Sequence, residues 1–280
     1  MTDHELCQAR ADAGRAKSLA ATTSPFTIAV RFLGGLSDTQ MAAFAAAADL
    51  WVEVIVGDLP DVLVDGEVVD DVLILAEGRD IDGPGKVLGM AGPTHVRPRE
   101  AGPSAFTPVK GVMRFDTADL ARMEATGVLG DVITHEMGHV LGIGTLWDLK
   151  GLITGAGTAD PRFTGAGAIA EYRKLRGGTS DEPVPVENTG GPGTADGHWR
   201  ERVFGDELMT GFVGDAGNPL SRLTAAALGD FGYAVDVDAA DHYALPTPST
   251  VAALLAEAPP GHDVARPTPV VLPAASLDAR

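Results

Sequence analysis

The sequence contains little cysteine, few aromatic residues and no long apolar run. Cys7 is the single cysteine among 280 residues, which excludes an intrachain disulfide. Aromatic residues make up 5% of the chain and hydrophobic residues 45%, so the expected core consists mainly of alanine, valine and leucine. No apolar run reaches the roughly 18 residues that a membrane-spanning helix needs. The length allows one large domain or two lobes around a cleft.

Basic residues are also scarce, and the formal net charge is −18. Such a surface would repel the phosphates of nucleic acids and of anionic membranes, so neither partner is expected. The first residues, Met-Thr-Asp-His-Glu-Leu-Cys, lack the basic start and apolar stretch of a secretory signal. Taken at face value the chain is a cytoplasmic monomer, or a secreted protein whose signal has been removed.

The most informative run is His135-Glu136-Met137-Gly138-His139, an H-E-x-x-H motif. On a helix, His135 and His139 lie one turn apart on the same face and can bind one zinc ion. Glu136 projects beside them and can handle a metal-bound water without being a ligand. The flanking residues are apolar, so the histidine pair is expected to be buried.

Hydrophobic patterning around this run indicates strands that alternate with helices. The pattern predicts strands at residues 26–32, 72–76, 86–91 and 111–116, and helices at 39–54, 118–124, 128–141, 168–175 and 220–233. Asp38 is the expected cap of the first helix, and Gly142 suits the left-handed position after the motif helix. This order predicts an α/β lobe with a mostly parallel sheet.

Composition divides the chain into four segments. They are a polar lead (1–24), an N-terminal lobe with the motif helix (25–144), a C-terminal lobe (145–245) and a proline-rich tail (246–280). Residues 151–197 read as an irregular surface insertion, and the tail as extended with at most one short helix at 250–257.

A zinc site needs a third protein ligand, and His198 is the best candidate. At this point the chain resembles the leishmanolysin-like metzincins. H-E-x-x-H-x-x-G opens the metzincin signature, but the position of the usual third histidine is occupied by Thr145. In leishmanolysin-like peptidases a long insertion displaces that histidine, and a turn containing methionine follows. Here 58 residues separate His139 from His198, and Met209 stands eleven positions further on.

The resemblance covers roughly residues 26–243 and implies a zinc metalloendopeptidase that acts on a peptide or protein. It implies a metzincin-like α/β (α+β) fold, with a twisted sheet, an active-site helix and an irregular C-terminal lobe. By the same resemblance, Zn²⁺ is held by His135, His139 and His198, and Met209 forms an apolar floor beneath it. Glu136 is then the general base, and Gly142 ends the motif helix in a turn.

Several alternatives stay open at this point. Glu171, His242 or His262 could replace His198, and Cys7 could block the metal as a thiolate. Acidic pairs that could bind calcium are Asp58 with Asp61 and Asp80 with Asp82, although their spacing matches no EF-hand loop. The protein could also be a non-catalytic zinc-stabilised peptide-binding protein, or a zinc hydrolase of a non-peptide amide.

The stretch Val87–Ala91, followed by Gly92, is a candidate for an exposed sheet edge. A peptide substrate could add to such an edge as one more strand. An ordinary strand explains the pattern equally well. Gly89→Pro would distinguish the two, because proline removes a backbone donor and should weaken peptide binding only if this edge is used.

Overall fold

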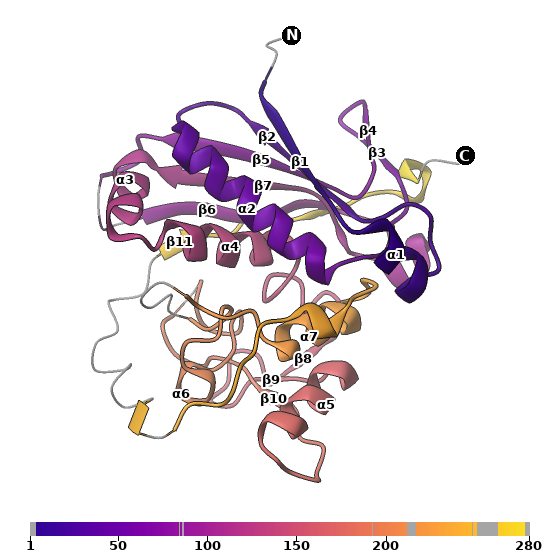
Figure 1. Ribbon diagram of the computed structural model, residues 1–280, viewed down its shortest axis with the longest axis vertical. Coiled ribbons are helices and arrows are strands. Elements are labelled where there is room, and N and C mark those ends of the chain that lie inside the picture. The colour runs from indigo at the N-terminus through magenta and orange to yellow at the C-terminus, as the bar shows by residue number, and fades with distance from the viewer. Residues whose placement is uncertain are drawn as a thin grey trace.

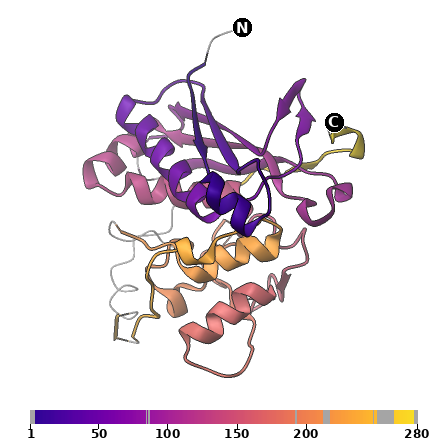
Figure 2. The ribbon, with the colours of Figure 1, turned by 45° about the vertical axis from the view of Figure 1, so that its right-hand side comes forward.

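The computed structural model describes residues 4–83, 85, 87–191, 193–211, 217–247, 249–250 and 263–277. The chain folds into an upper lobe built on a large sheet and a lower, more irregular lobe (Figure 1). A view from another side shows the same division (Figure 2). Within these residues, no helix combines the length and hydropathy needed to cross a bilayer.

The large sheet has seven strands in the order β1-β2-β5-β7-β6-β11, and β12 also pairs with β6. Their bounds are β1 Leu6–Arg10, β2 Thr27–Phe32, β5 Val72–Arg79, β6 Val87–Val96, β7 Pro108–Asp116, β11 Asp263–Ala265 and β12 Val270–Val271. Pairings β1–β2 and β6–β7 are antiparallel, and the other four are parallel. The predicted mixed α/β fold with a mostly parallel sheet is confirmed.

Two helices, α2 (Asp38–Val54) and α4 (Leu129–Val140), pack against each other. In Figure 1, α2 crosses in front of the sheet and α4 lies between the sheet and the lower lobe. α2 buries the side chains of Phe44 and Trp51 completely. The Trp51 indole N–H donates to the Thr134 carbonyl at 3.0 Å, which fixes α2 against the motif helix. The cap of α2 is Ser37 rather than the expected Asp38, because the hydroxyl of Ser37 and the side chain of Gln40 form a reciprocal capping box.

Both chain ends contribute more structure than their sequences indicated. The expected polar lead forms β1 and the helix α1 (Ala13–Leu19), and the expected extended tail forms β11, β12 and the 3₁₀ turn η3 (Ala274–Ser276). These short strands form through backbone hydrogen bonds to β2 and β6 and need no hydrophobic alternation of their own. Their sequences therefore did not indicate strands. The helix expected at 250–257 falls on residues that are almost all outside the described ranges.

A hairpin of β3 (Val62–Val64) and β4 (Glu67–Val69) was also missed. Its turn residues Asp65 and Gly66 have φ of 52° and 81°, the left-handed conformation that two-residue hairpin turns need. The Asp-Gly pair between valine-rich runs was the available signal.

The lower lobe packs α5 (Ala166–Leu175) against α7 (Arg222–Phe231). Its remaining elements are α6 (Glu201–Phe204) and three two-residue strands, β8 (Ile153–Thr154), β9 (Arg162–Phe163) and β10 (Val184–Pro185). Between these elements the chain is irregular, as expected. The rings of Trp147, Phe163 and Trp199 contact one another in its core at tilted and edge-to-face angles, with ring centroids 4.8–5.4 Å apart.

The upper lobe also contains α3 (Thr117–Thr126), which begins at the cap Asp116, and the 3₁₀ segment η1 (Arg99–Ser104). A further 3₁₀ turn, η2 (Val237–Ala239), follows α7 in the chain. The expected helix at 118–124 is therefore present and slightly longer.

Candidate metal centre

Three histidines from distant parts of the chain meet where the two lobes join. His135 and His139 project from α4, and His198 lies in the loop before α6. The Nε2 atom of His198 is 3.2 Å from that of His135 and 3.0 Å from that of His139. Tetrahedral zinc with Zn–N bonds of about 2.0–2.1 Å holds its ligand nitrogens roughly 3.4 Å apart. The cluster therefore has nearly the dimensions of a zinc site.

Backbone carbonyls orient all three imidazole rings. The Nδ1 atoms of His135, His139 and His198 lie 2.6, 2.8 and 2.8 Å from the carbonyl oxygens of Leu208, Ile143 and Thr194, respectively. A carbonyl oxygen only accepts, so each Nδ1 carries the ring proton. The Nε2 lone pairs of the three rings then face one another with no proton between them, an arrangement that a shared cation stabilises.

Burial keeps these rings neutral. His135, His139 and His198 are 4%, 2% and 5% exposed. Loss of hydration lowers the pKa of His135 to about 4 and the pKa values of the other two well below the usual range. Neutral imidazole is the form that binds a metal ion, so the donor set fits zinc.

Glu136 lies beside the triad on the same helix and is 5% exposed. Among the described residues its Oε2 has no hydrogen-bond partner. Burial raises the pKa of Glu136 to about 7, and the nearby positive charge of Arg266 acts in the opposite direction. A buried carboxylate with one oxygen free to accept a proton has the chemistry of a general base.

The loop that carries His198 is held close to the end of α4. Gly144 has φ of +71°, and a Cβ atom there would lie 1.8 Å from the Gly197 carbonyl oxygen. Gly142 has φ of +107°, the left-handed region that its expected turn requires. Only glycine allows two backbone segments to approach this closely.

A buried acid that the sequence did not single out organises the same loop. Glu187 is 2% exposed and accepts hydrogen bonds from the backbone N–H groups of Asn188, Thr189 and Glu201. Its own N–H donates to the carbonyl of His198 at 2.8 Å. Glu187 therefore fixes the backbone on which His198 is mounted.

Met209 packs directly against the motif helix. A Cβ atom on Gly138, which stands between the two histidines of α4, would lie 2.7 Å from the Met209 sulfur. Met209 is fully buried, so its thioether forms apolar packing beneath this turn of the helix.

A second buried acid, Glu207, holds the turn that contains Met209. Its carboxylate accepts hydrogen bonds from the N–H of Met209 and from the N–H and hydroxyl of Ser221, and also from the Thr224 hydroxyl. The carbonyl of Leu208 in this turn is the acceptor for His135. Glu207 thus contributes to the orientation of the His135 ring. The sequence did not indicate this role, because nothing in it distinguishes Glu207 from the many other acidic residues.

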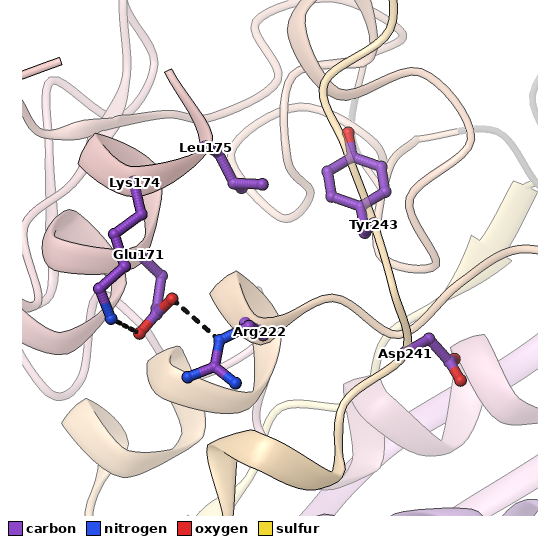
Figure 3. A pocket seen from close by; sticks show the side chains of 6 residues that line it. All are labelled: Glu171, Lys174, Leu175, Arg222, Asp241 and Tyr243. Carbon is purple, nitrogen blue, oxygen red and sulfur yellow. Dashed lines mark hydrogen bonds and ion pairs between the residues drawn. The ribbon is translucent and has the colours of Figure 1, made fainter. Parts of the chain in front are cut away.

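The alternative metal ligands lie elsewhere. Glu171 forms ion pairs with Lys174 at 2.6 Å and Arg222 at 3.2 Å on the outside of the lower lobe, in a pocket that Tyr243 also lines (Figure 3). Thr145 donates its hydroxyl proton to the His139 carbonyl at 2.7 Å, so it caps the helix where the usual third histidine would stand.

Of three other candidate ligands, two lie away from the triad and one lies outside the described residues. His242 is exposed, and His262 lies outside the described residues. Cys7 lies in β1, at the far side of the sheet from β6, and burial raises the pKa of its thiol, which disfavours a thiolate.

Asp58 belongs to an acidic cluster other than the pair with Asp61 that the sequence indicated. Within the described ranges, Asp58 groups with Asp70 and Asp71 closely enough to share an ion. The Asp71 carboxylate already accepts the backbone N–H groups of Thr27 and Leu59. Calcium binding stays a prediction, as do the monomeric state and the compartment.

The mixed sheet, the buried H-E-x-x-H helix and the histidine triad are features of a metzincin-like metallopeptidase. The sequence model of the leishmanolysin family (peptidase M8) matches residues 103–252, more than half of the chain. The chain belongs to this family.

Two relatives can be compared directly with this chain. A leishmanolysin homolog of Crithidia fasciculata is 30% identical over 133 residues, which cover 45% of this chain and 20% of that protein. Leishmanolysin of Leishmania donovani is 32% identical over 133 residues, which cover 45% of this chain and 22% of that protein. The matched segment thus spans about a fifth of the length of these relatives.

Proposed function

We propose that this chain is a zinc-dependent metalloendopeptidase, in which His135, His139 and His198 hold the metal ion and Glu136 is the general base. One observation carries the proposal: three unprotonated Nε2 atoms converge beside a buried carboxylate with a free oxygen. A closed structural zinc site has four protein ligands and gives such a carboxylate no function. No fourth histidine, cysteine or acidic ligand joins the triad among the described residues.

The residues of the chain would divide the reaction between binding and proton transfer. When bound, Zn²⁺ lowers the pKa of water and polarises the carbonyl of the substrate. The Oε2 atom of Glu136 accepts the proton of the attacking water and then donates it to the nitrogen of the departing amine. The carboxylate is regenerated, and water has been added across the peptide bond. The carbonyls that bind the three Nδ1 atoms keep the rings in the tautomer that this site needs.

Cleavage of a diverse peptide library by the zinc-loaded protein, read by mass spectrometry beside Glu136→Ala, tests the proposal. We expect cleavage by the wild type alone, with one zinc ion in both proteins. Equal cleavage by Glu136→Ala would disprove the role of Glu136. Absence of cleavage by either protein, with zinc bound, would favour a zinc-stabilised peptide-binding protein or a hydrolase of a non-peptide amide.

His198→Ala tests the third ligand separately. Removal of one of three imidazoles should abolish stoichiometric zinc binding or weaken it by at least the roughly 10–100-fold that loss of an outer-shell partner costs. His242→Ala, at an exposed histidine, is the matched control and should keep the zinc content of the wild type. Measurement of bound zinc after dialysis decides the result, and unchanged zinc in His198→Ala would place the third ligand elsewhere.

A further inference from the structure

The outer edge of β6, the candidate edge for an extended peptide, is occupied by the C-terminal part of the chain itself. β11 runs parallel to β6 and pairs residues 263–265 with Val87, Gly89 and Met90. β12 pairs Val270 with His95 and Val271 with Val96. Figure 1 shows β11 beside β6 and α4. The edge expected from the sequence is therefore present but covered.

Between β11 and β12 the chain turns toward the metal centre. Arg266 donates a hydrogen bond from Nη2 to the Gly193 carbonyl at 2.5 Å, and a Cβ atom on Gly197 would lie 2.1 Å from its Nη1. The guanidinium thus crosses from β6 to the loop that carries His198. Pro267 follows it and packs on Gly92, where a Cβ atom would lie 3.0 Å from the proline Cδ.

The charge of Arg266 also faces the catalytic machinery. Burial lowers the pKa of the Arg266 guanidinium, and the negative charge of the nearby Glu136 carboxylate acts in the opposite direction.

A separate apolar contact anchors the end of this segment far from the triad. Leu272 and Leu277 pack on the small hydrophobic cluster beneath the β3–β4 hairpin, which includes Val62 and Leu73. Leu277 also forms a backbone bridge with Val62, and the Leu272 N–H donates to Val96 at 3.1 Å. Figure 2 shows this end of the chain beside the hairpin.

We propose that residues 263–277, here called the strap, are an autoinhibitory segment that occupies the peptide-binding edge of β6 and holds Arg266 over the metal centre. This inference rests on the proposed peptidase function. A peptide can pair with β6 only when the strap has left it. Pro267 and Pro269 lie between β11 and β12 and lack backbone N–H groups, so they interrupt the outer edge of the strap.

Two variants release the strap from opposite ends. Arg266→Ala removes the contact in the cleft, and Leu277→Asp places a charge in the apolar anchor, away from the triad. Val270→Ala is the matched control, because the side chain of Val270 lies in the same segment and is 55% exposed. All three are made in the full chain, loaded with one zinc ion.

The first measurement is the affinity for a tripeptide hydroxamate, which combines an extended backbone with a zinc-binding group and requires no turnover. Loss of a hydrogen bond from a charged donor should raise the fraction of molecules in which the strap has left β6 by roughly ten- to a hundredfold. The apparent affinity for the hydroxamate rises with that fraction. We expect both release variants to bind the hydroxamate at least tenfold more tightly than the wild type, and Val270→Ala to match the wild type. If both release variants bind the hydroxamate with the affinity of the wild type, autoinhibition by the strap is disproved.

The second measurement is kcat/KM on a peptide from the library, which separates this proposal from the proposed function. An increase in both release variants by a similar factor supports the strap and the peptidase together. Tighter hydroxamate binding without cleavage by any variant keeps the strap as a block of the metal centre and rejects the peptidase. Cleavage with equal kcat/KM in wild type and both variants rejects the strap and keeps the peptidase.

Discussion

The loop that carries His198 lies against the end of the motif helix at Gly144. Comparison of Gly144→Ala with Gly151→Ala measures how much free energy of unfolding is lost when an added methyl group pushes the two apart. Both glycines have a left-handed backbone, with φ of +71° and +67°. That conformation lowers the free energy of unfolding of an alanine variant by about 1–2 kcal/mol. Alanine also reduces the conformational entropy of the unfolded chain, which offsets roughly 0.4–1 kcal/mol of this loss. Gly151 has no atom within 4 Å of an added Cβ, so Gly151→Ala should lower the free energy of unfolding by about 1 kcal/mol or less.

Gly144→Ala adds a clash that Gly151→Ala lacks. Its Cβ would lie 1.8 Å from the Gly197 carbonyl oxygen, a backbone atom that cannot rotate away. Overpacking of this kind costs about 1–3 kcal/mol, so the total loss should be about 1–4 kcal/mol. Because Gly197 precedes His198, the displacement should also reduce zinc affinity by about tenfold or more.

Urea denaturation of the metal-free proteins and competition for zinc with a chelator measure the two effects. Gly144→Ala should be the less stable variant by at least about 1 kcal/mol and should be the one that loses zinc affinity. Equal stability and equal zinc affinity of the two variants would refute the close approach of Gly144 to Gly197.

Two further predictions concern buried acids. Glu207→Ala leaves the N–H groups of Met209 and Ser221 without an acceptor, at about 1–3 kcal/mol each, so urea denaturation should show a loss of about 2–6 kcal/mol. Glu100→Ala, at an exposed acid, should stay within about 0.5 kcal/mol of the wild type, and an equal loss in both would reject the role of Glu207. Hydrogen bonds from backbone N–H groups, with that of Ile81 the strongest, lower the pKa of Asp116 to about 2. Its contribution to stability is thus present above pH 3.8 and is lost as the pH falls toward 2, so denaturation midpoints across this range should fall less in Asp116→Asn than in the wild type.

The elements found from the sequence are those whose own residues carry the periodic signal. α4 combines two histidines at helical spacing with apolar neighbours, and β2, β5 and β7 each contain several branched or aromatic residues. Such patterns arise because one face of the element is buried against the sheet, and the residues of that face can be recognised from the local sequence alone. Helix ends were less accurate, because Ser37 rather than Asp38 satisfies the first N–H groups of α2.

The features that were missed depend on partners far away in the chain. β11 and β12 consist of three and two residues, and they are strands only because β6 offers its edge. Glu187 and Glu207 gain their roles from donors in other segments, and neither residue type nor spacing reveals that an acid is buried. Arg266 is a single basic residue in a proline-rich run, and only the folded chain brings it beside Glu136.

Titration of zinc into the metal-free protein, with cleavage of one library peptide followed at each addition, shows whether the histidine triad and Glu136 form a zinc-dependent peptidase site. We expect activity to rise linearly and to reach a plateau at one zinc ion per chain. Activity should be absent from Glu136→Gln, although that variant binds the same single ion. The titration is run in the wild type and in Arg266→Ala, so that a covered cleft is not mistaken for an inactive one. Cleavage by the metal-free protein, or by Glu136→Gln at the wild-type rate, would contradict the account.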